Sequence, residues 1–163
     1  MNHESIEIKA SSHGLGVFAK KIFVKNEQIL HYAGAVISSG SAQEVDEADH
    51  CLQIGPNIFL GPSGEADDYL NHSCEPNSAV IINGQNATLI ALRKIIPDEE
   101  IVNDYSLTVD EAGWTMRCTC DSSKCRGTIK SFRELPKDWQ AHYKAMGIVP
   151  KFILENTPPR SIP

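Results

Sequence analysis

The stretch Asn71-His72-Ser73-Cys74-Glu75-Pro76-Asn77 is the most informative part of this sequence, because it concentrates polar side chains, a thiol and a proline directly after Tyr69-Leu70. Taken alone, such a run is most often a loop in which an asparagine side chain closes a turn and a proline interrupts regular pairing. Its interpretation therefore depends on the sequence on either side.

A second polar segment, downstream, is rich in cysteine. Cys118, Cys120 and Cys125 have the spacing C-x-C-x4-C, and the residues between them are mostly polar, which disfavours a buried core segment. Structural zinc takes four thiolate or imidazole ligands in a tetrahedron, so these three thiols need a fourth ligand. The spacing leaves three candidates for it, which are Cys74, Cys51 and His72.

Composition places the chain among ordinary globular proteins and excludes some functions. Its 163 residues suit one domain, with 41% hydrophobic and 22% charged residues. The net charge of -6 argues against binding nucleic acid through the overall field, so no direct nucleic-acid contact is expected. No apolar run approaches the roughly 20 residues of a membrane helix, so no membrane association is expected.

The N-terminus and the cysteine count indicate a reducing compartment. Residues 1–5 have neither a basic patch nor an apolar core, so we expect no secretory signal. An odd number of cysteines, five, also argues against a disulfide framework. We therefore expect an intracellular protein, cytoplasmic or nuclear.

Alternating patterns and short apolar runs predict strands over most of the chain. Strands are expected at 5–9, 15–18 and 28–32, and a hairpin at 79–82 and 88–92 around Asn83-Gly84. Five residues separate the two hairpin runs, so a two-residue turn is not assured. The polar, acidic stretch 38–49 is expected to form a loop or a short helix.

Only the C-terminal region has a helical pattern. Leu135, Trp139, Tyr143 and Met146 recur at spacings of four, four and three, which places them on one face, and Gly147 is a plausible helix end. We expect this helix to pack on the core and the proline-containing tail 156–163 to fray. The sequence thus predicts a mostly-β fold with a C-terminal helix.

Residues 71–77 match the pattern N-H-S-C-x-P-N, which resembles the signature of SET-domain protein lysine methyltransferases. Four further segments resemble motifs of that family and occur in the family's order: the G-x-G loop at 14–18, Y-x-G at 32–34, E-[LI]-x-x-D-Y at 100–105, and the post-SET zinc motif at 118–127. The resemblance covers roughly residues 5–130, and chance agreement of the ordered set is remote.

The resemblance implies a fold, a division of the chain and a metal site. The expected fold is the SET fold of small curved sheets with a C-terminal pseudoknot. Residues 1–112 would form the SET domain, 113–130 the post-SET zinc-binding segment, and 131–163 a C-terminal helix and tail. The implied zinc ligands are Cys74, Cys118, Cys120 and Cys125, which leaves Cys51 free.

The implied activity is transfer of a methyl group from S-adenosylmethionine to the ε-amine of a lysine in a histone or another basic protein. Tyr105 would be the catalytic residue, although without the surrounding motif a buried tyrosine with one satisfied hydroxyl would be the simpler interpretation. The resemblance implies these cofactor-binding residues: His13, Gly14, Leu15, Gly16, Asn71, His72, Tyr105 and Ile129.

Three further residues are candidates for the substrate channel. Tyr32 would form part of the wall, and Trp114 would line a pocket or, equally, belong to the core. Asn103 stands where the family often has an aromatic residue that helps decide how many methyl groups are added. An asparagine there leaves room for a bulkier amine or holds a water that blocks one, so the number of methyl groups stays open.

The sequence also departs from the family pattern. Asp68 replaces the usual arginine, Gly61-Pro62-Ser63-Gly64 lacks the usual G-N element, and Cys51 stands in place of a cofactor-contacting tyrosine. The segment between Tyr32 and Asn71 is short, so a partner subunit, such as a second copy in a homo-oligomer, is one way to complete the substrate groove. Two alternatives to the enzyme are an inactive SET module that binds proteins and an unrelated zinc-ribbon protein.

Overall fold

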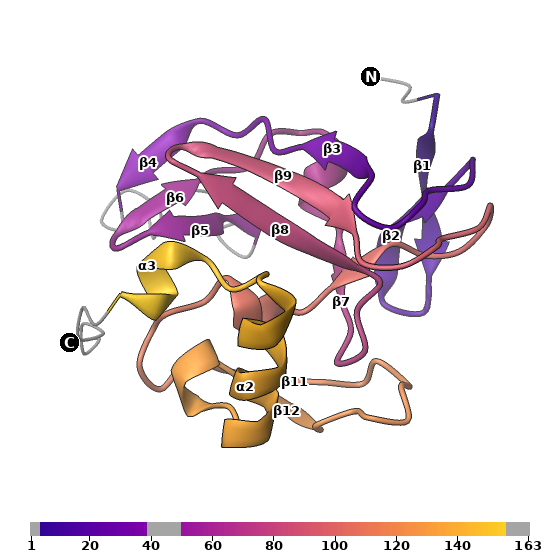
Figure 1. Cartoon of the computed structure of the whole chain (residues 1–163). Coiled ribbons are helices and arrows are strands. Elements are labelled where there is room, and N and C mark those ends of the chain that lie inside the picture. Colours follow the sequence, from indigo (N-terminus) through magenta and orange to yellow (C-terminus); the bar gives the residue numbers. More distant parts are fainter. Residues whose placement is uncertain (1–3, 39–49, 156–163) are drawn as a thin grey trace.

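The computed structural model describes residues 4–38 and 50–155, and in this part of the chain short strands outnumber helices (Figure 1). The mostly-β prediction is confirmed. The predicted fraying tail and the predicted loop at 38–49, except Ser38, lie outside the described residues. No helix in the described ranges is both long and apolar enough to cross a membrane.

The strands form small separate sheets instead of one continuous sheet. Antiparallel pairing joins β1 (Ile6–Ser11) to β2 (Gly14–Ala19), and β11 (Thr115–Arg117) to β12 (Thr128–Lys130). One three-stranded sheet has the order β3 (Gln28–His31), β9 (Asn86–Ala91), β8 (Ser78–Asn83). The other has the order β4 (Val36–Ser38), β6 (Ile58–Leu60), β5 (Leu52–Gly55).

The predicted hairpin is present and its turn is tighter than the apolar runs alone indicate. Asn83 of β8 pairs with Asn86 of β9, so only Gly84 and Gln85 connect the strands. Gly84 has a φ of 61°, in the left-handed region that two-residue hairpin turns require.

One short parallel pair lies where the polar motif meets the segment that precedes Tyr105. Strand β7 (Asn71–His72) pairs in parallel with β10 (Val102–Asn103). Asn77 reinforces the pair, since its Nδ2 donates to the Glu100 carbonyl at 2.7 Å and its Oδ1 accepts the Val102 N–H at 2.9 Å. Two segments some thirty residues apart in sequence are thereby held side by side.

The C-terminal helix is also confirmed, with different ends from the predicted pattern. Helix α2 (Lys137–Met146) stops at Gly147, which has a φ of 70°. Leu135 is buried but precedes the helix, in the turn after η4 (Phe132–Glu134), and Met146 is 40% exposed. The packed face of α2 is therefore shorter than the predicted one.

Two hydrophobic clusters hold these elements together. The larger lies among the β-sheets and includes Val17, Phe23, Leu30, Leu89 and Ile101. The second joins α2 and α3 (Lys151–Leu154) to the β-sheets and includes Ala79, Leu107, Phe132, Tyr143 and Ile153. Figure 1 shows α2 and α3 on the side of the molecule that also carries β11 and β12.

The glycine of the Y-x-G segment is required by a close approach of two backbones. Ala35 accepts a hydrogen bond from the Gly61 N–H at 2.9 Å, and a Cβ at Gly34 would overlap the Gly61 carbonyl oxygen. Backbone, unlike a flexible side chain, cannot move aside without displacing β4 or β6.

We expect Gly34→Ala to lower the free energy of unfolding by about 3 kcal/mol or more, the upper range for overpacking. Gly84→Ala is the matched control, because it also introduces a Cβ but meets nothing within 4 Å. It should cost roughly 1 kcal/mol for its left-handed backbone. Urea denaturation followed by circular dichroism measures both, and equal losses would contradict this packing.

Candidate active site

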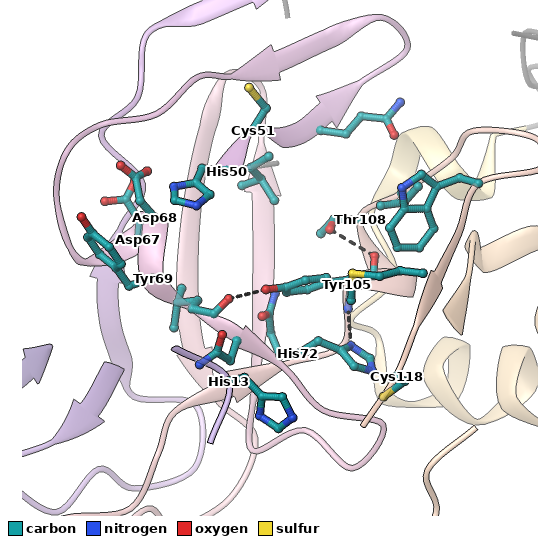
Figure 2. Close-up of a pocket in the computed structure, with 18 of the residues that line it drawn as sticks. His13, His50, Cys51, Asp67, Asp68, Tyr69, His72, Tyr105, Thr108 and Cys118 are labelled. Atoms are coloured by element: carbon teal, nitrogen blue, oxygen red, sulfur yellow. Dashed lines mark hydrogen bonds between the residues drawn. The ribbon is translucent and has the colours of Figure 1, made fainter. Parts of the chain in front are cut away.

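A cavity of about 940 Å³ lies between the motif 71–72, Tyr105 and the cysteine segment (Figure 2). Eight of the eleven residues proposed from the sequence for the cofactor site and the substrate channel line it: His13, Leu15, Tyr32, Asn71, His72, Asn103, Tyr105 and Trp114. Its volume is at the upper end of the range for small-molecule and cofactor sites. Gly14, Gly16 and Ile129 do not line it.

Tyr105 stands at the centre of the cavity wall, at the first position of η3 (Tyr105–Leu107). Its hydroxyl donates to the Leu70 carbonyl at 2.6 Å, and its backbone N–H donates to His72 Nδ1 at 3.2 Å. Burial, helped by the Glu100 carboxylate, raises the pKa of Tyr105 to about 12. The hydroxyl thus stays protonated with its hydrogen fixed, and its oxygen can still accept a hydrogen bond.

His72 connects the cavity to the cysteines. Burial lowers the pKa of His72 to about 4, so the ring is neutral near pH 7. Since Nδ1 accepts the Tyr105 N–H, the hydrogen of the neutral ring belongs on Nε2, which lies 3.3 Å from Cys74 Sγ. The imidazole therefore donates toward a sulfur on one side and holds the Tyr105 backbone on the other.

Asn71 ties the N-terminal loop to the site. Its Nδ2 lies within hydrogen-bond distance of Ser11 Oγ, the Leu15 carbonyl and Glu100 Oε1, at 3.1, 3.0 and 2.7 Å. A Cβ at Gly16 would overlap Glu100 Oε1 and crowd Asn71 Nδ2. Gly16 therefore serves side-chain packing, whereas Gly14 has a φ of 96° that favours glycine.

His13 bridges two segments that are far apart in sequence. Its Nε2 lies 2.8 Å from the Thr119 carbonyl oxygen and 3.1 Å from Thr119 Oγ1. The N-terminal loop and the cysteine segment thus meet at one side of the cavity. Nothing in the local sequence around either residue signals this contact.

Sulfur atoms gather directly beside the cavity. The ligand atoms of His72, Cys74, Cys118 and Cys120 lie within 4.8 Å of one another, and Cys74 Sγ is 3.7 Å from Cys118 Sγ. Sulfurs bound to one tetrahedral zinc at 2.3 Å are about 3.8 Å apart. Cys125 Sγ lies 3.7 Å from the Cys118 carbonyl, and its side chain interacts with those of Cys118 and Cys120.

Backbone N–H groups point at these sulfurs. Cys74 N–H donates to Cys120 Sγ at 3.4 Å, and Arg126 N–H donates to Cys74 Sγ at 3.3 Å. Burial opposes ionisation of Cys120, but backbone donors outweigh it and lower its pKa to about 7, while burial raises the pKa of Cys74 to about 11. The donor set and spacing fit a structural zinc ion, and Cys51 lies outside the cluster on the cavity wall.

Asn103 presents an unusual buried acceptor. Its side chain is 4% exposed, and its Oδ1 is buried without a hydrogen-bond partner among the described residues. Asn103 also lines the cavity, but this oxygen is itself closed off from solvent, so a ligand N–H or O–H group would meet it only after the side chain turned toward the cavity.

The other candidates divide between the cavity and the core. Ile129 is fully buried in a cluster with Cys74 and Cys118, behind the cavity wall. Trp114 packs against the same cluster and also lines the cavity, so both interpretations of it hold. Tyr32 lines the cavity, and burial, followed by the Asp67 carboxylate, raises its pKa.

Two departures from the family pattern, Asp68 and the Gly61–Gly64 loop, contact each other at the side of the cavity away from His13. Asp68, in η2 (Ala66–Tyr69), accepts the N–H groups of Ser63 and Gly64 at 3.0 and 2.6 Å. The aspartate and the Gly61–Gly64 loop thus form one hydrogen-bonded unit. Asp67 accepts from the Ala33 N–H and Ser63 Oγ.

This fold and this cavity define a class of protein, which sequence comparison identifies. The family model described as "SET domain" matches residues 14–106, more than half of the chain. The chain belongs to the SET-domain family, and the resemblance to that family is confirmed.

Curated relatives carry methyltransferase names and are much longer. Human "Histone-lysine N-methyltransferase 2B" is 32% identical over 131 residues, covering 72% of this chain and 5% of that protein. "Histone-lysine N-methyltransferase set-2" of Caenorhabditis elegans is 30% identical over 131 residues, covering 72% and 9%. The chain thus spans less than a tenth of the length of these two relatives.

Solved structures share the fold. The chain is similar to KRYPTONITE in complex with mCHH DNA, an H3(1-15) peptide and SAH, with a TM-score of 0.62, 22% identity, and coverage of 77% of this chain and 29% of that chain. It is similar to Arabidopsis thaliana SUVH6 in complex with SAM, with a TM-score of 0.64, 20% identity, and coverage of 76% and 32%. The predicted SET fold is therefore confirmed.

Proposed function

We propose that this chain is an S-adenosylmethionine-dependent protein lysine methyltransferase. The observation that carries the proposal is Tyr105, whose hydroxyl is fixed by the Leu70 carbonyl at the wall of a large cavity. The family, the names of the relatives and the SAH and SAM in the similar structures support it.

The proposed cofactor side of the cavity is built from the N-terminal loop and the 71–72 motif. Leu15 and His13 line the cavity there, and Asn71 holds the loop through the Leu15 carbonyl. Gly14 leaves open space at its backbone, and Gly16 lets Asn71 and Glu100 pack against the loop. When bound, the cofactor would supply an electrophilic methyl group on a sulfonium.

The proposed reaction is an in-line displacement by a neutral lysine amine, in which a carbon–nitrogen bond forms, the carbon–sulfur bond breaks and an amine proton leaves to solvent. Burial that raises the pKa of Tyr105 to about 12 would equally disfavour a substrate ammonium at that point. The Tyr105 oxygen would accept an amine N–H and align its lone pair, which is catalysis by orientation.

The acidic far wall supports a basic protein as substrate. Asp67 and Asp68 line the cavity on the side away from His13 (Figure 2), and Glu111 is a further carboxylate that lines it. These carboxylates would attract cationic side chains that flank the target lysine. We propose a histone or another basic protein, met in the nucleus or another intracellular compartment.

We expect Tyr105→Phe to lower methyl transfer about a hundredfold or more, as for loss of a hydrogen bond that aligns a reacting group. The control is Tyr69→Phe, a cavity tyrosine that contacts His50. Transfer of a radiolabelled methyl group to core histones and to lysate proteins measures activity, and calorimetry measures SAH binding.

Both variants should bind SAH like the wild type. A wild-type protein that binds neither SAH nor S-adenosylmethionine would refute the enzyme and favour the alternative, a zinc-stabilised SET module that binds proteins.

We further propose that Cys74, Cys118, Cys120 and Cys125 bind one zinc ion. His72 also lies within the group, but its Nδ1 accepts from Tyr105 and its Nε2–H points to Cys74 Sγ. Because both ring nitrogens take part in these hydrogen bonds, the neutral imidazole donates to a sulfur that binds the metal and has no lone pair left to bind the metal itself. The fourth position therefore goes to Cys125.

We expect the purified protein to contain one zinc per chain and Cys125→Ser to lose most of it. Cys51→Ser is the matched control and should keep its zinc. Chelation should cost several kcal/mol of stability, roughly 10 °C in Tm. Elemental mass spectrometry and thermal melting measure both effects. Full zinc in Cys125→Ser, combined with loss in His72→Gln, would transfer the ligand role to His72.

We propose that Asn103 favours monomethylation. Once turned toward the cavity, its unpaired Oδ1 would accept an N–H of the substrate amine, and the neutral tertiary amine of dimethyllysine has no N–H to donate. The acceptor therefore stabilises primary amines best and tertiary amines least.

We expect Asn103→Leu, which keeps similar volume but removes the acceptor, to raise the share of di- and trimethyllysine several-fold. Mass spectrometry of a peptide time course measures the products, with premethylated peptides as controls. Accumulation of trimethyllysine by the wild type would be incompatible with this role.

A further inference from the structure

A fully buried carboxylate, that of Asp104, lies directly before Tyr105 and has four donors. Arg126 Nη1 and Nη2 donate to its two oxygens at 2.7 Å each, Tyr143 Oη donates at 2.7 Å, and the Ser106 N–H donates at 3.1 Å. A buried charge is stable only with such compensation, so these donors fix the carboxylate in place.

Arg126 joins this carboxylate to the sulfur cluster. Its Nη2 also lies 3.2 Å from Ser106 Oγ, so the guanidinium contacts the residues on both sides of Tyr105. The backbone N–H of the same residue donates to Cys74 Sγ. The guanidinium lies over the Trp139 ring, 5.2 Å from its centroid.

Tyr143 joins the carboxylate to helix α2. The side chain is 2% exposed, and burial, with Asp104 next, raises the pKa of its hydroxyl, which stays protonated as a donor. Trp139 and Tyr143 lie one turn apart on α2, and the centroids of their rings are 5.6 Å apart. Helix α2 follows the residues that match the SET domain, which end at 106.

The Tyr105 carbonyl accepts from the Thr108 and Val109 N–H groups at 3.1 and 3.2 Å, which restrains the backbone after it. The Tyr105 backbone N–H is held by His72 and its hydroxyl by Leu70, while both neighbouring residues are held through Arg126. Neither Arg126, Asp104 nor Tyr143 lines the cavity, so none of them can contact the reactants.

We propose that Tyr143 and Arg126 are positioning residues, which orient Tyr105 through the Asp104 carboxylate and make helix α2 part of the methyl-transfer machinery. The inference rests on the proposed methyltransferase function. Without the Tyr143 hydroxyl, one carboxylate oxygen keeps a single donor and the carboxylate can pivot about Arg126. A shift of Tyr105 by a fraction of an ångström misaligns the transition state but leaves cofactor binding in place.

The first test is Tyr143→Phe, which removes only the hydroxyl. We expect kcat to fall three- to thirtyfold while KM for S-adenosylmethionine stays within twofold. Ile153→Val is the matched control, because Ile153 is buried in the same cluster as Tyr143 and its aliphatic side chain has no group that could donate a hydrogen bond to Asp104. Measured well below both Tm values, the control should keep the wild-type kcat. A kcat for Tyr143→Phe within twofold of the wild type would overturn the proposal.

A second readout does not depend on activity. Incorporated 3-fluorotyrosine gives a fluorine resonance for Tyr105, which Tyr105→Phe identifies. Tyr143→Phe should shift or broaden this resonance, and Ile153→Val should not. If the wild type transfers no methyl group, the proposed function fails and the resonance alone decides, since an unchanged Tyr105 signal in Tyr143→Phe would refute positioning.

Discussion

The parallel contact between residues 71–72 and 102–103 is the constraint on which the rest of the site depends. It has only two residue pairs, so its own hydrogen bonds cannot hold it, and Asn77 supplies the others through the Glu100 carbonyl and the Val102 N–H. This contact places His72 beside Tyr105, and Leu70 within reach of the Tyr105 hydroxyl. The proposed catalytic tyrosine is thus oriented by the motif that decides the fold.

Small sheets explain why polar residues have such a large structural role here. Sheets of two or three strands are marginal on their own, since each buries little apolar surface. The described part of the chain compensates with buried side chains that bond to backbone from other segments, such as Asn77 to Glu100 and Asp67 to Ala33. Each such group is stabilising only while its partners are in place, because an unpaired buried polar group is costly. The sheets are therefore joined by specific contacts.

Local pattern in the sequence was enough for strands β1, β2 and β3, the β8–β9 hairpin and the C-terminal helix, but not for the shorter strands β4 to β7 and β10 to β12. The ordered motifs were enough for the family. Most of the cofactor and channel residues proposed from the sequence line one cavity, including Asn103 and Trp114. Sequence could not show contacts across long separations, such as His13 with Thr119, or the position of Ile129 behind the wall. It also could not show that Asp68 caps the Gly61–Gly64 loop, because neither departure carries the signal alone.

The hydrogen bonds of His72 connect the residues around Tyr105 to the sulfur cluster beside the cavity. Because Nδ1 of the ring accepts the Tyr105 N–H, the ring hydrogen lies on Nε2 and points to Cys74. The contact with Tyr105 therefore fixes the tautomer that Cys74 meets. Arg126 repeats the connection, with its backbone on Cys74 and its guanidinium on Asp104. Two links, both ending on Cys74, therefore couple the sulfur cluster to the residues around Tyr105. A displacement of Cys74 would move both links together, and the geometry of the tyrosine depends on the cluster even though no cysteine needs to touch the reacting atoms.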